Sequence, residues 1–222
     1  MLIPHLIFAH MLADYVLQSN WLVARKGESW TGLAMHGGIV GFMSTMAVAP
    51  YLDVVWLPLL VLMILHTLQD QGKIRFGPRL SVHPFIPYMA DQFSHYAQIG
   101  LFQLWVGSRL SHTPPYAEIA FMWAGAAVIV VTRFYDITWW ANWLDMIPYL
   151  DRWRRFAYAE RLSMLALAAA GLWIIAPLCL LPRLIFASTN GAAIWHQRRG
   201  VLEMLIGAVL SIACGVGLHA ML

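Results

Sequence analysis

Long apolar stretches recur along the whole of this chain of 222 residues. They lie at 2–23, 32–51, 54–73, 88–107, 116–137, 159–181 and 200–221, and each approaches the roughly 20 residues that a helix needs to cross about 30 Å of hydrocarbon. Charged residues make up only 11% of the chain and apolar residues 60%. So few charges cannot cover the surface of a water-soluble domain of this length. The sequence therefore predicts an all-α, polytopic transmembrane helical bundle of about seven spans.

The formal net charge of +3 is too small to indicate a nucleic-acid partner, and the apolar composition excludes a disordered chain. Because no internal repeat is present, we expect one integral membrane domain over 1–222. Its helices in 1–107 carry the polar residues, and those in 116–222 support them. The segment 138–156 contains four tryptophans and three arginines, which is typical of a segment lying among lipid headgroups. An ordinary aromatic belt between two spans is an equally good interpretation.

The orientation follows from the basic residues. Ten of the 14 Lys and Arg residues fall on one side of the seven-span topology, and four fall on the other: Arg109, Arg183, Arg198 and Arg199. Because basic loops remain in the cytoplasm, we expect the N-terminus outside and the C-terminus inside the bacterial cytoplasmic (inner) membrane. Glu203 and Arg183, which belong to the last two spans, are expected to pair structurally.

Polar residues interrupt the first four spans in a regular way. His10 and Asp14, His66 and Asp70, and Asp91 and His95 are each four residues apart, so the two members of each pair face the same way on a helix. His36 lies in the second span. With alternating helix directions, all seven residues fall in the cytoplasmic half of the bilayer. We therefore expect them to converge on one polar centre.

A divalent metal is the natural partner of such a centre. Three carboxylates at membrane depth cost about 2.5–3.5 kcal/mol each on insertion scales, and a divalent cation offsets that charge. His with carboxylate suits zinc, manganese or iron better than magnesium. The predicted metal ligands are His10, Asp14, His36, His66, Asp70, Asp91 and His95, enough for one ion with supporting carboxylates or for two ions. A metal-free proton relay and a purely structural hydrogen-bond network are the alternative interpretations.

The residues flanking these ligands suggest further roles. Lys73 and Lys26 lie near the inner ends of their spans; they are either anchors that extend to the headgroups or groups that bind a substrate phosphate or carboxylate. Gln18 and Gln92 are candidate hydrogen-bond donors to the substrate or between helices. In a catalytic interpretation, one of Asp14, Asp70 and Asp91 acts as general base, and Lys73 or Lys26 stabilises developing negative charge.

These residues resemble the pattern of a known family. The runs "HMLADYVLQSNWLVARK", "MHGG", "LHTLQDQGK" and "DQFSH" are similar to a bacterial membrane protein family catalogued as a domain of unknown function, number 3307. The resemblance covers about 1–100 and extends more loosely to Glu160, Arg161 and the Glu203, Gly207, Ser211 positions. It implies that the polar residues belong together, and it implies no activity.

The function that the sequence favours is a membrane-embedded, metal-dependent hydrolase. We expect it to act on a lipid or lipid-linked phosphate from the cytoplasmic leaflet, with a metal-activated water as nucleophile. The surplus of ligands and the basic flanks motivate this hypothesis, whereas no GxSxG or HExxH motif is present. The alternatives are a transporter or proton or metal carrier that uses the same residues as a relay, and a non-catalytic membrane scaffold. An inverted repeat, which many transporters show, is absent.

Overall fold

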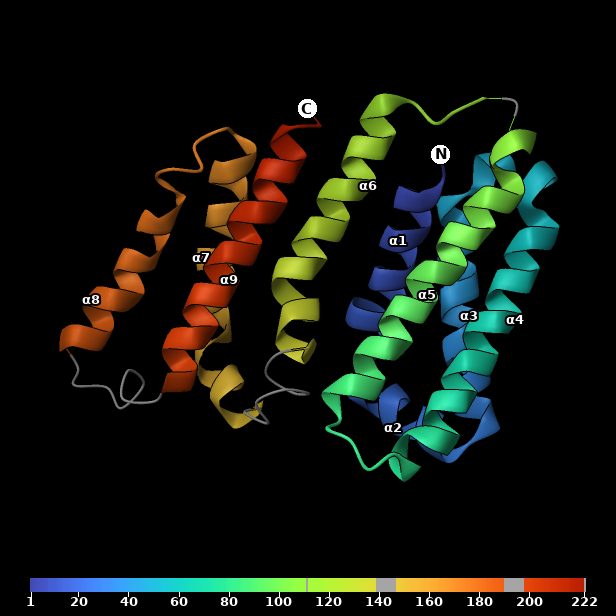
Figure 1. Cartoon of the computed structure of the whole chain (residues 1–222), viewed down its shortest axis with the longest axis horizontal. Coiled ribbons are helices and arrows are strands. Elements are labelled where there is room, and N and C mark those ends of the chain that lie inside the picture. Colours follow the sequence, from blue (N-terminus) through green and yellow to red (C-terminus); the bar gives the residue numbers. More distant parts are fainter. Residues whose placement is uncertain (111, 139–146, 190–197, 222) are drawn as a thin grey trace. The chain divides into compact units, whose positions relative to one another are not determined.

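The computed structural model describes residues 1–110, 112–138, 147–189 and 198–221. Within this part of the chain every regular element is helical, and no strand is present, which confirms the predicted all-α class (Figure 1). The chain divides into two compact units, unit 1 over Met1–Ala126 and unit 2 over Ala127–Leu222.

Unit 1 consists of α1 (Ile3–Met11), which continues as a π-helical turn over Leu12–Leu17, followed by α2 (Asn20–Glu28), α3 (Trp30–Ala47), α4 (Leu52–Phe76) and α5 (Phe85–Val106). The helix α6 (Tyr116–Ile129) begins in unit 1 and ends in unit 2. The helices α1, α4 and α5, together with α3, pack side by side.

The first predicted span, 2–23, is not one helix. The backbone of Gln18 is extended, and Ser19 caps a new helix by accepting a hydrogen bond from the Leu22 N–H at 3.3 Å. A serine at this position satisfies one of the free N–H groups of a helix start, so the chain turns here and α2 runs separately. The prediction of a continuous span over 2–23 is therefore wrong.

Unit 1 has an apolar end and a polar end. At the apolar end, residues from the start of α1, the start of α4 and the end of α5 form one buried cluster that includes Leu2, Leu6, Val55, Leu59, Phe102 and Val106. The Leu2 N–H donates a hydrogen bond to Gln103 Oε1 at 2.6 Å and joins the two chain segments there. The predicted polar residues lie toward the other end of the same helices.

The exposed face of α4 is the apolar one. Four large side chains at helical spacing are 44–58% exposed: Leu57, Leu60, Ile64 and Leu68. The opposite face is buried: Val55, Leu59, His66 and Asp70. In water a surface helix shows the reverse arrangement, and an exposed apolar stripe of this kind indicates a lipid or protein environment.

Three helices in the described part of the chain are long and apolar enough to cross a membrane, namely Ala49–Arg79, Tyr116–Thr138 and Val201–His219. The expected seven spans are thus not supported. The break at Gln18 leaves an apolar helix of only Ile3–Leu17. The segment 159–181 is also interrupted, because the backbone reverses at Gly171, which has a φ of +81°; glycine adopts this conformation without steric cost.

Unit 2 contains α7 (Ile147–Ala169), a 3-10 helix over Ala176–Leu180, α8 (Leu181–Thr189) and α9 (Arg198–His219). The helices α7 and α9 run parallel, because residues later in α7 contact residues later in α9. A Cβ on Gly207 would lie 3.2 Å from the Arg161 side chain, and one on Gly215 would lie 2.5 Å from Ala168 Cβ. Further along, His219 Nδ1 lies 3.1 Å from the Ala169 carbonyl oxygen.

This parallel arrangement corrects the predicted topology, since consecutive spans at 159–181 and 200–221 would be antiparallel. The start of α9, with Arg198 and Arg199, lies at the same end of unit 2 as the start of α7. Arg183 is buried, and it donates to Glu203 Oε2 at 2.6 Å and to Glu160 Oε1 at 3.0 Å, so the expected pairing with Glu203 is confirmed.

The predicted interfacial segment, 138–156, is described only in part. Its residues 139–146, with three of the four tryptophans, lie outside the described residues, and the chain from Ile147 onward belongs to α7.

Cysteine labelling tests the topology of unit 2. In a chain whose native Cys179 and Cys214 are replaced by alanine, Arg155→Cys and Arg199→Cys should react with a membrane-impermeant maleimide from the same side of oriented vesicles. Leu172→Cys, in the turn at the other end of α7, should react from the opposite side. Labelling of the two former Arg positions from opposite sides would contradict the parallel arrangement of α7 and α9.

Candidate metal centre

Seven polar side chains come together at the polar end of unit 1, and we refer to them as the His/Asp centre. They come from the end of α1, the π-helical turn, α3, α4 and α5: His10, Asp14, His36, His66, Asp70, Asp91 and His95. Six are buried, and Asp14 is partly buried. The structure therefore brings together every residue that the sequence proposed as a metal ligand.

Asp70 lies in the middle of the centre. Its Oδ2 is 3.3 Å from His36 Nε2 and 3.9 Å from His66 Nε2. Its Oδ1 is 3.7 Å from His95 Nε2. One carboxylate thus faces imidazoles from three different helices.

Asp14 occupies the side of the centre next to α3. Its Oδ1 lies 3.3 Å from His36 Nε2, and its Oδ2 lies 3.8 Å from His10 Nε2. The π-helical turn at Leu12–Leu17 carries this carboxylate. Such turns change the direction of side chains within a helix and are frequent at functional sites.

Glycine residues on α3 permit the close contact with α4. A Cβ on Gly37 would lie 2.7 Å from Thr67 Oγ1, and one on Gly41 would overlap the Met63 side chain. Because the two helices can approach here, His36 Nε2 and His66 Nε2 lie only 3.4 Å apart.

Asp91 and His95 form the side of the centre on α5. Their Oδ1 and Nε2 atoms are 3.4 Å apart. Lys73 Nζ lies 2.6 Å from Asp91 Oδ2, and Gln69 donates to Asp91 Oδ1 at 3.1 Å and to its carbonyl oxygen at 2.8 Å. Asp91 is therefore held in place by two side chains from α4.

The donor atoms fit a metal ion. Three groups each offer ligand atoms within 4.8 Å of one another: His10, Asp14 and His66; His36, His66 and Asp70; and Asp70, Asp91 and His95. Several of these atoms are buried and have no hydrogen-bond partner among the described residues: His10 Nε2, Asp14 Oδ1 and His95 Nε2. Such buried, unpaired polar atoms are costly, and coordination of a cation would satisfy them.

The charges of the centre are consistent with the same conclusion. Its three carboxylates contribute −3, and the two lysines that contact them, Lys26 and Lys73, contribute +2. With neutral imidazoles the sum is −1 in a buried site. A buried, unbalanced charge is expensive, and either an added cation or a proton on one imidazole would balance it.

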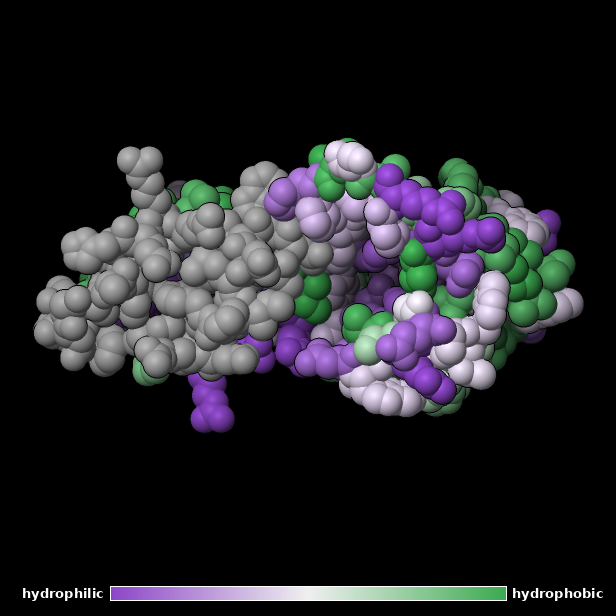
Figure 2. Space-filling model, turned by 90° about the horizontal axis from the view of Figure 1, so that it is seen from below, coloured by the Kyte–Doolittle hydropathy of each residue, from purple (hydrophilic) through white to green (hydrophobic). Residues whose placement is uncertain are grey.

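The polar end of unit 1 is also basic. Arg25 and Lys26 lie in the last turn of α2, Lys73 and Arg75 in the last turn of α4, and Arg79 directly after it. Figure 2 shows hydrophilic residues gathered on this face of unit 1, around a hollow. An anionic ligand would meet a favourable field at this end.

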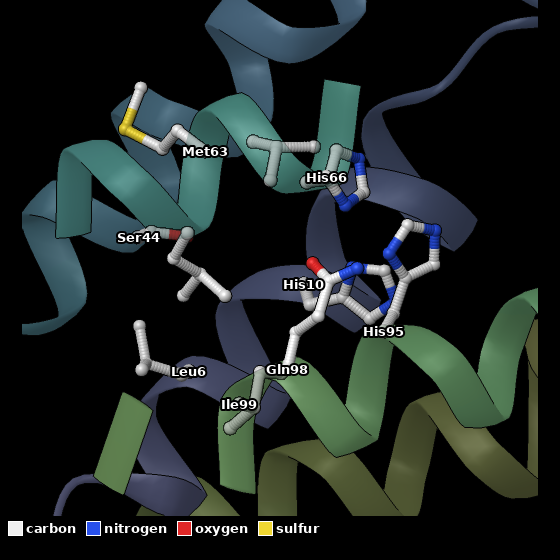
Figure 3. Close-up of a pocket in the computed structure, with 10 residues that line it drawn as sticks. Leu6, His10, Ser44, Met63, His66, His95, Gln98 and Ile99 are labelled. Atoms are coloured by element: carbon white, nitrogen blue, oxygen red, sulfur yellow. The ribbon is translucent and has the colours of Figure 1, made fainter. Parts of the chain in front are cut away.

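On its other side, the centre borders a small cavity. His10, His66 and His95 line one wall with Gln98, and Leu6, Val40, Leu62, Met63 and Ile99 contribute apolar side chains. Figure 3 shows the three imidazole rings gathered on one side of this cavity, across from Leu6, Ser44 and Met63. The centre thus lies between a basic face and the apolar core.

The comparison with known families agrees with the resemblance seen in the sequence. A family model described as a protein of unknown function (DUF3307) matches residues 2–119, more than half of the chain. The chain belongs to the DUF3307 family. The match includes all seven residues of the His/Asp centre and ends before Glu160 and Glu203. No curated protein and no solved structure matches the chain.

The predicted substrate-binding residues of this DUF3307 protein lie in different settings. Lys26 Nζ lies 3.0 Å from Asp70 Oδ2. With its amide oxygen turned toward that lysine, Gln18 accepts a hydrogen bond from Lys26 Nζ at 3.0 Å. Its amide nitrogen then donates to the Asp14 carbonyl oxygen at 3.2 Å. Gln92 is buried and accepts a hydrogen bond from the Tyr15 hydroxyl at 2.6 Å. It supports the centre from within, whereas Gln18 and Lys26 lie at its edge.

Three residues in contact with the centre were missed in the sequence. Gln69 holds Asp91, and the hydroxyl groups of Tyr15 and Tyr88 lie 2.9 Å apart next to Gln92. A glutamine within an apolar helix indicates a polar contact inside the protein, so Gln69 could have been identified from the sequence. The tyrosines carry no such signal, because they are common in membrane helices.

The other histidines in the described part of the chain lie outside the centre. His5 lies 2.8 Å from Glu118, His112 stacks against Tyr51, and His219 contacts the end of α7. Among the described residues, all three groups that could hold a metal lie in the His/Asp centre.

The lysine contacts predict different costs for two matched substitutions. Lys26→Met removes the partner of buried Asp70, and breaking a buried ion pair costs about 3–5 kcal/mol. The Lys73 side chain is 35% exposed, compared with 13% for Lys26, so Lys73→Met should cost clearly less. Thermal unfolding of the two variants in detergent with chelator measures this difference. Equal losses would contradict the assigned role of Lys26.

Proposed function

We propose that this DUF3307 protein is a metal-dependent hydrolase of the bacterial cytoplasmic membrane that acts on a lipid or lipid-linked phosphate at the cytoplasmic leaflet. The observation that carries the proposal is the convergence of imidazole Nε2 atoms from four histidines with the carboxylates of Asp14, Asp70 and Asp91. Such a donor set is suited to zinc, manganese or iron.

The membrane location rests on exposed apolar side chains. Besides the three helices long enough to span, we propose that α1 with its π-helical turn, α3 and α5 also cross the bilayer, since α3 and α5 pack against α4 and α1 packs against α3 and α5. The basic residues at the polar end of unit 1 favour that end as cytoplasmic. The N-terminus, at the apolar end, then lies outside.

The proposed role of each group in the reaction follows from its position in the centre. A bound metal would supply Lewis acidity and lower the pKa of water at the centre. Asp14, whose side chain is 10% exposed compared with 4% for Asp70 and Asp91, is the carboxylate best placed to accept a proton from an attacking water. Lys73 and Lys26 would bind phosphate oxygens as negative charge develops.

The substrate class follows from the surroundings. The centre has a basic face at one side and lipid-exposed apolar helices around it, so an anionic headgroup at the membrane surface reaches it without leaving the bilayer. In the reaction, the water oxygen forms a bond to phosphorus and the bond from phosphorus to the leaving oxygen breaks. The proton of the water passes to Asp14, and the leaving oxygen takes up a proton.

Metal content and phosphate release from the same preparation test the proposal. Protein purified without chelator should contain at least one zinc, manganese or iron per chain. It should release phosphate from phosphatidic acid or a polyprenyl diphosphate in mixed micelles, lose this activity with EDTA and regain it with metal. Asp70→Asn should lower both metal content and turnover, turnover by roughly 100-fold or more, because it removes the central ligand.

The matched control is Asp53→Asn, which changes an exposed carboxylate on the same helix and should leave both readings unchanged. Absence of stoichiometric metal, together with unchanged binding of added metal in His66→Ala and Asp70→Ala, would refute the hydrolase. Metal uptake into proteoliposomes without phosphate release would favour the carrier instead.

A second variant pair examines Lys73. Lys73→Gln should lower the turnover by roughly 10²–10³-fold with the metal content unchanged, as expected for a group that stabilises charge in the transition state. Lys73→Arg, which keeps the charge, should restore part of the rate. A loss of metal in Lys73→Gln would contradict a role in charge stabilisation and leave the contact with Asp91 as the main role of this residue.

A further inference from the structure

We infer that the His/Asp centre holds two divalent ions, bridged by the carboxylate of Asp70. This inference rests on the metal binding of the proposed function and extends it, because it states how many ions are bound and which residues hold each one. The inference depends on three contacts of the Asp70 carboxylate, with His36 of α3, His66 of α4 and His95 of α5.

The two oxygens of Asp70 face different sets of donors. Oδ2 is directed to His36 and His66, at 3.3 and 3.9 Å from their Nε2 atoms. Oδ1 is directed to His95 Nε2 at 3.7 Å. A carboxylate that presents one oxygen to each of two donor sets has the geometry of a bridging ligand. In two-metal hydrolytic sites, the ions lie about 3.5–4 Å apart.

The first site is arranged around His36. His36 Nε2 lies 3.3 Å from Asp14 Oδ1, 3.3 Å from Asp70 Oδ2 and 3.4 Å from His66 Nε2. A tetrahedral zinc site with bonds of about 2.0–2.1 Å separates its ligand atoms by roughly 3.3–3.4 Å. The distances from His36 match that separation, whereas His66 Nε2 and Asp70 Oδ2 lie farther apart, at 3.9 Å. His36, His66 and Asp70 therefore form the ligand set of the first site, and Asp14 lies beside it, available as a base.

The second site also has three protein ligands. Asp91 Oδ1 lies 3.4 Å from His95 Nε2, and Asp70 Oδ1 lies 3.7 Å from the same nitrogen. Three protein ligands leave a coordination position open for water or substrate, as in catalytic sites. Lys73 Nζ lies next to this site, 2.6 Å from the other oxygen of Asp91. An open position of the second site therefore lies next to this lysine.

His10 does not indicate a third ion. Its metal-capable group shares His66 with the first site, and its Nε2 lies 3.8 Å from the Asp14 oxygen that does not face His36. His10 is placed to orient Asp14 beside the first site.

The charge of a two-ion centre identifies its ligand. Two divalent ions contribute +4, the three carboxylates −3, and Lys26 and Lys73 +2, which leaves +3. A site with this surplus requires an anionic partner of high charge, and a phosphate group meets that requirement with oxygens that can contact both ions. A neutral ester or amide would leave the surplus uncompensated.

Manganese binding tests the inference directly. Protein stripped with EDTA and then loaded with Mn²⁺ should retain two ions per chain after gel filtration. Its low-temperature electron paramagnetic resonance spectrum should show an exchange-coupled pair. Asp91→Asn should retain one ion and show an uncoupled spectrum, because the second site is lost. His95→Gln should give the same result, so the test does not depend on one variant, and Asp53→Asn should behave like the unchanged chain.

One ion per chain at saturation would overturn the inference, and so would two ions without coupling, since Asp70 would then not bridge them. The proposed hydrolase is judged separately, by phosphate release. Two coupled ions without cleavage of any phosphate ester would refute the hydrolase and leave the two-ion centre intact. Cleavage of a phosphate ester by a chain that holds only one ion would refute the two-ion centre and leave the hydrolase intact.

Discussion

Unit 1 depends on how it accommodates three carboxylates away from bulk water. An Asp at membrane depth costs about 2.5–3.5 kcal/mol, and Asp70 lies among imidazoles from α3, α4 and α5. The break at Gln18 becomes important here, because it lets α2 turn and brings Lys26 to 3.0 Å from Asp70. A straight first helix would carry this lysine past the end of the centre. The bend therefore places a cation next to a buried carboxylate.

The opposite end of the same helices gives the centre its rigidity. Leu2, Val55 and Val106 are completely buried in the apolar core, and close packing there fixes the relative positions of α1, α4 and α5. Gly37 adds a close contact between α3 and α4 next to His36. Ligand atoms from separate helices can thus hold separations of 3–4 Å, which a metal site requires and which flexible loops do not maintain.

The all-helical class and the full set of centre residues could be predicted from the sequence, because the pairs at i and i+4 mark one face of a helix and apolar stretches mark its length. The direction of α9 could not be predicted in the same way, since hydropathy has no direction and the reversal depends on one residue, Gly171. The contact of Lys26 with Asp70 joins residues 44 apart in the chain. Only the packed helices bring them together, and a capping residue, Ser19, decides where the first helix ends.

The charged groups of unit 2 differ in their geometry from those of the His/Asp centre. There, Arg183 meets Glu160 and Glu203, and Arg161 meets Asp136, at N···O distances of 2.6–3.0 Å. These are ordinary charge-assisted hydrogen bonds, and each acid has an arginine. In the centre, the lysines contact Asp70 and Asp91 at similar distances of 3.0 and 2.6 Å, but the distances between imidazole nitrogens and carboxylate oxygens are longer, 3.3–3.9 Å. The longer separations are close to those between the ligand atoms of a tetrahedral metal site, which is the geometry that the proposed metal binding needs.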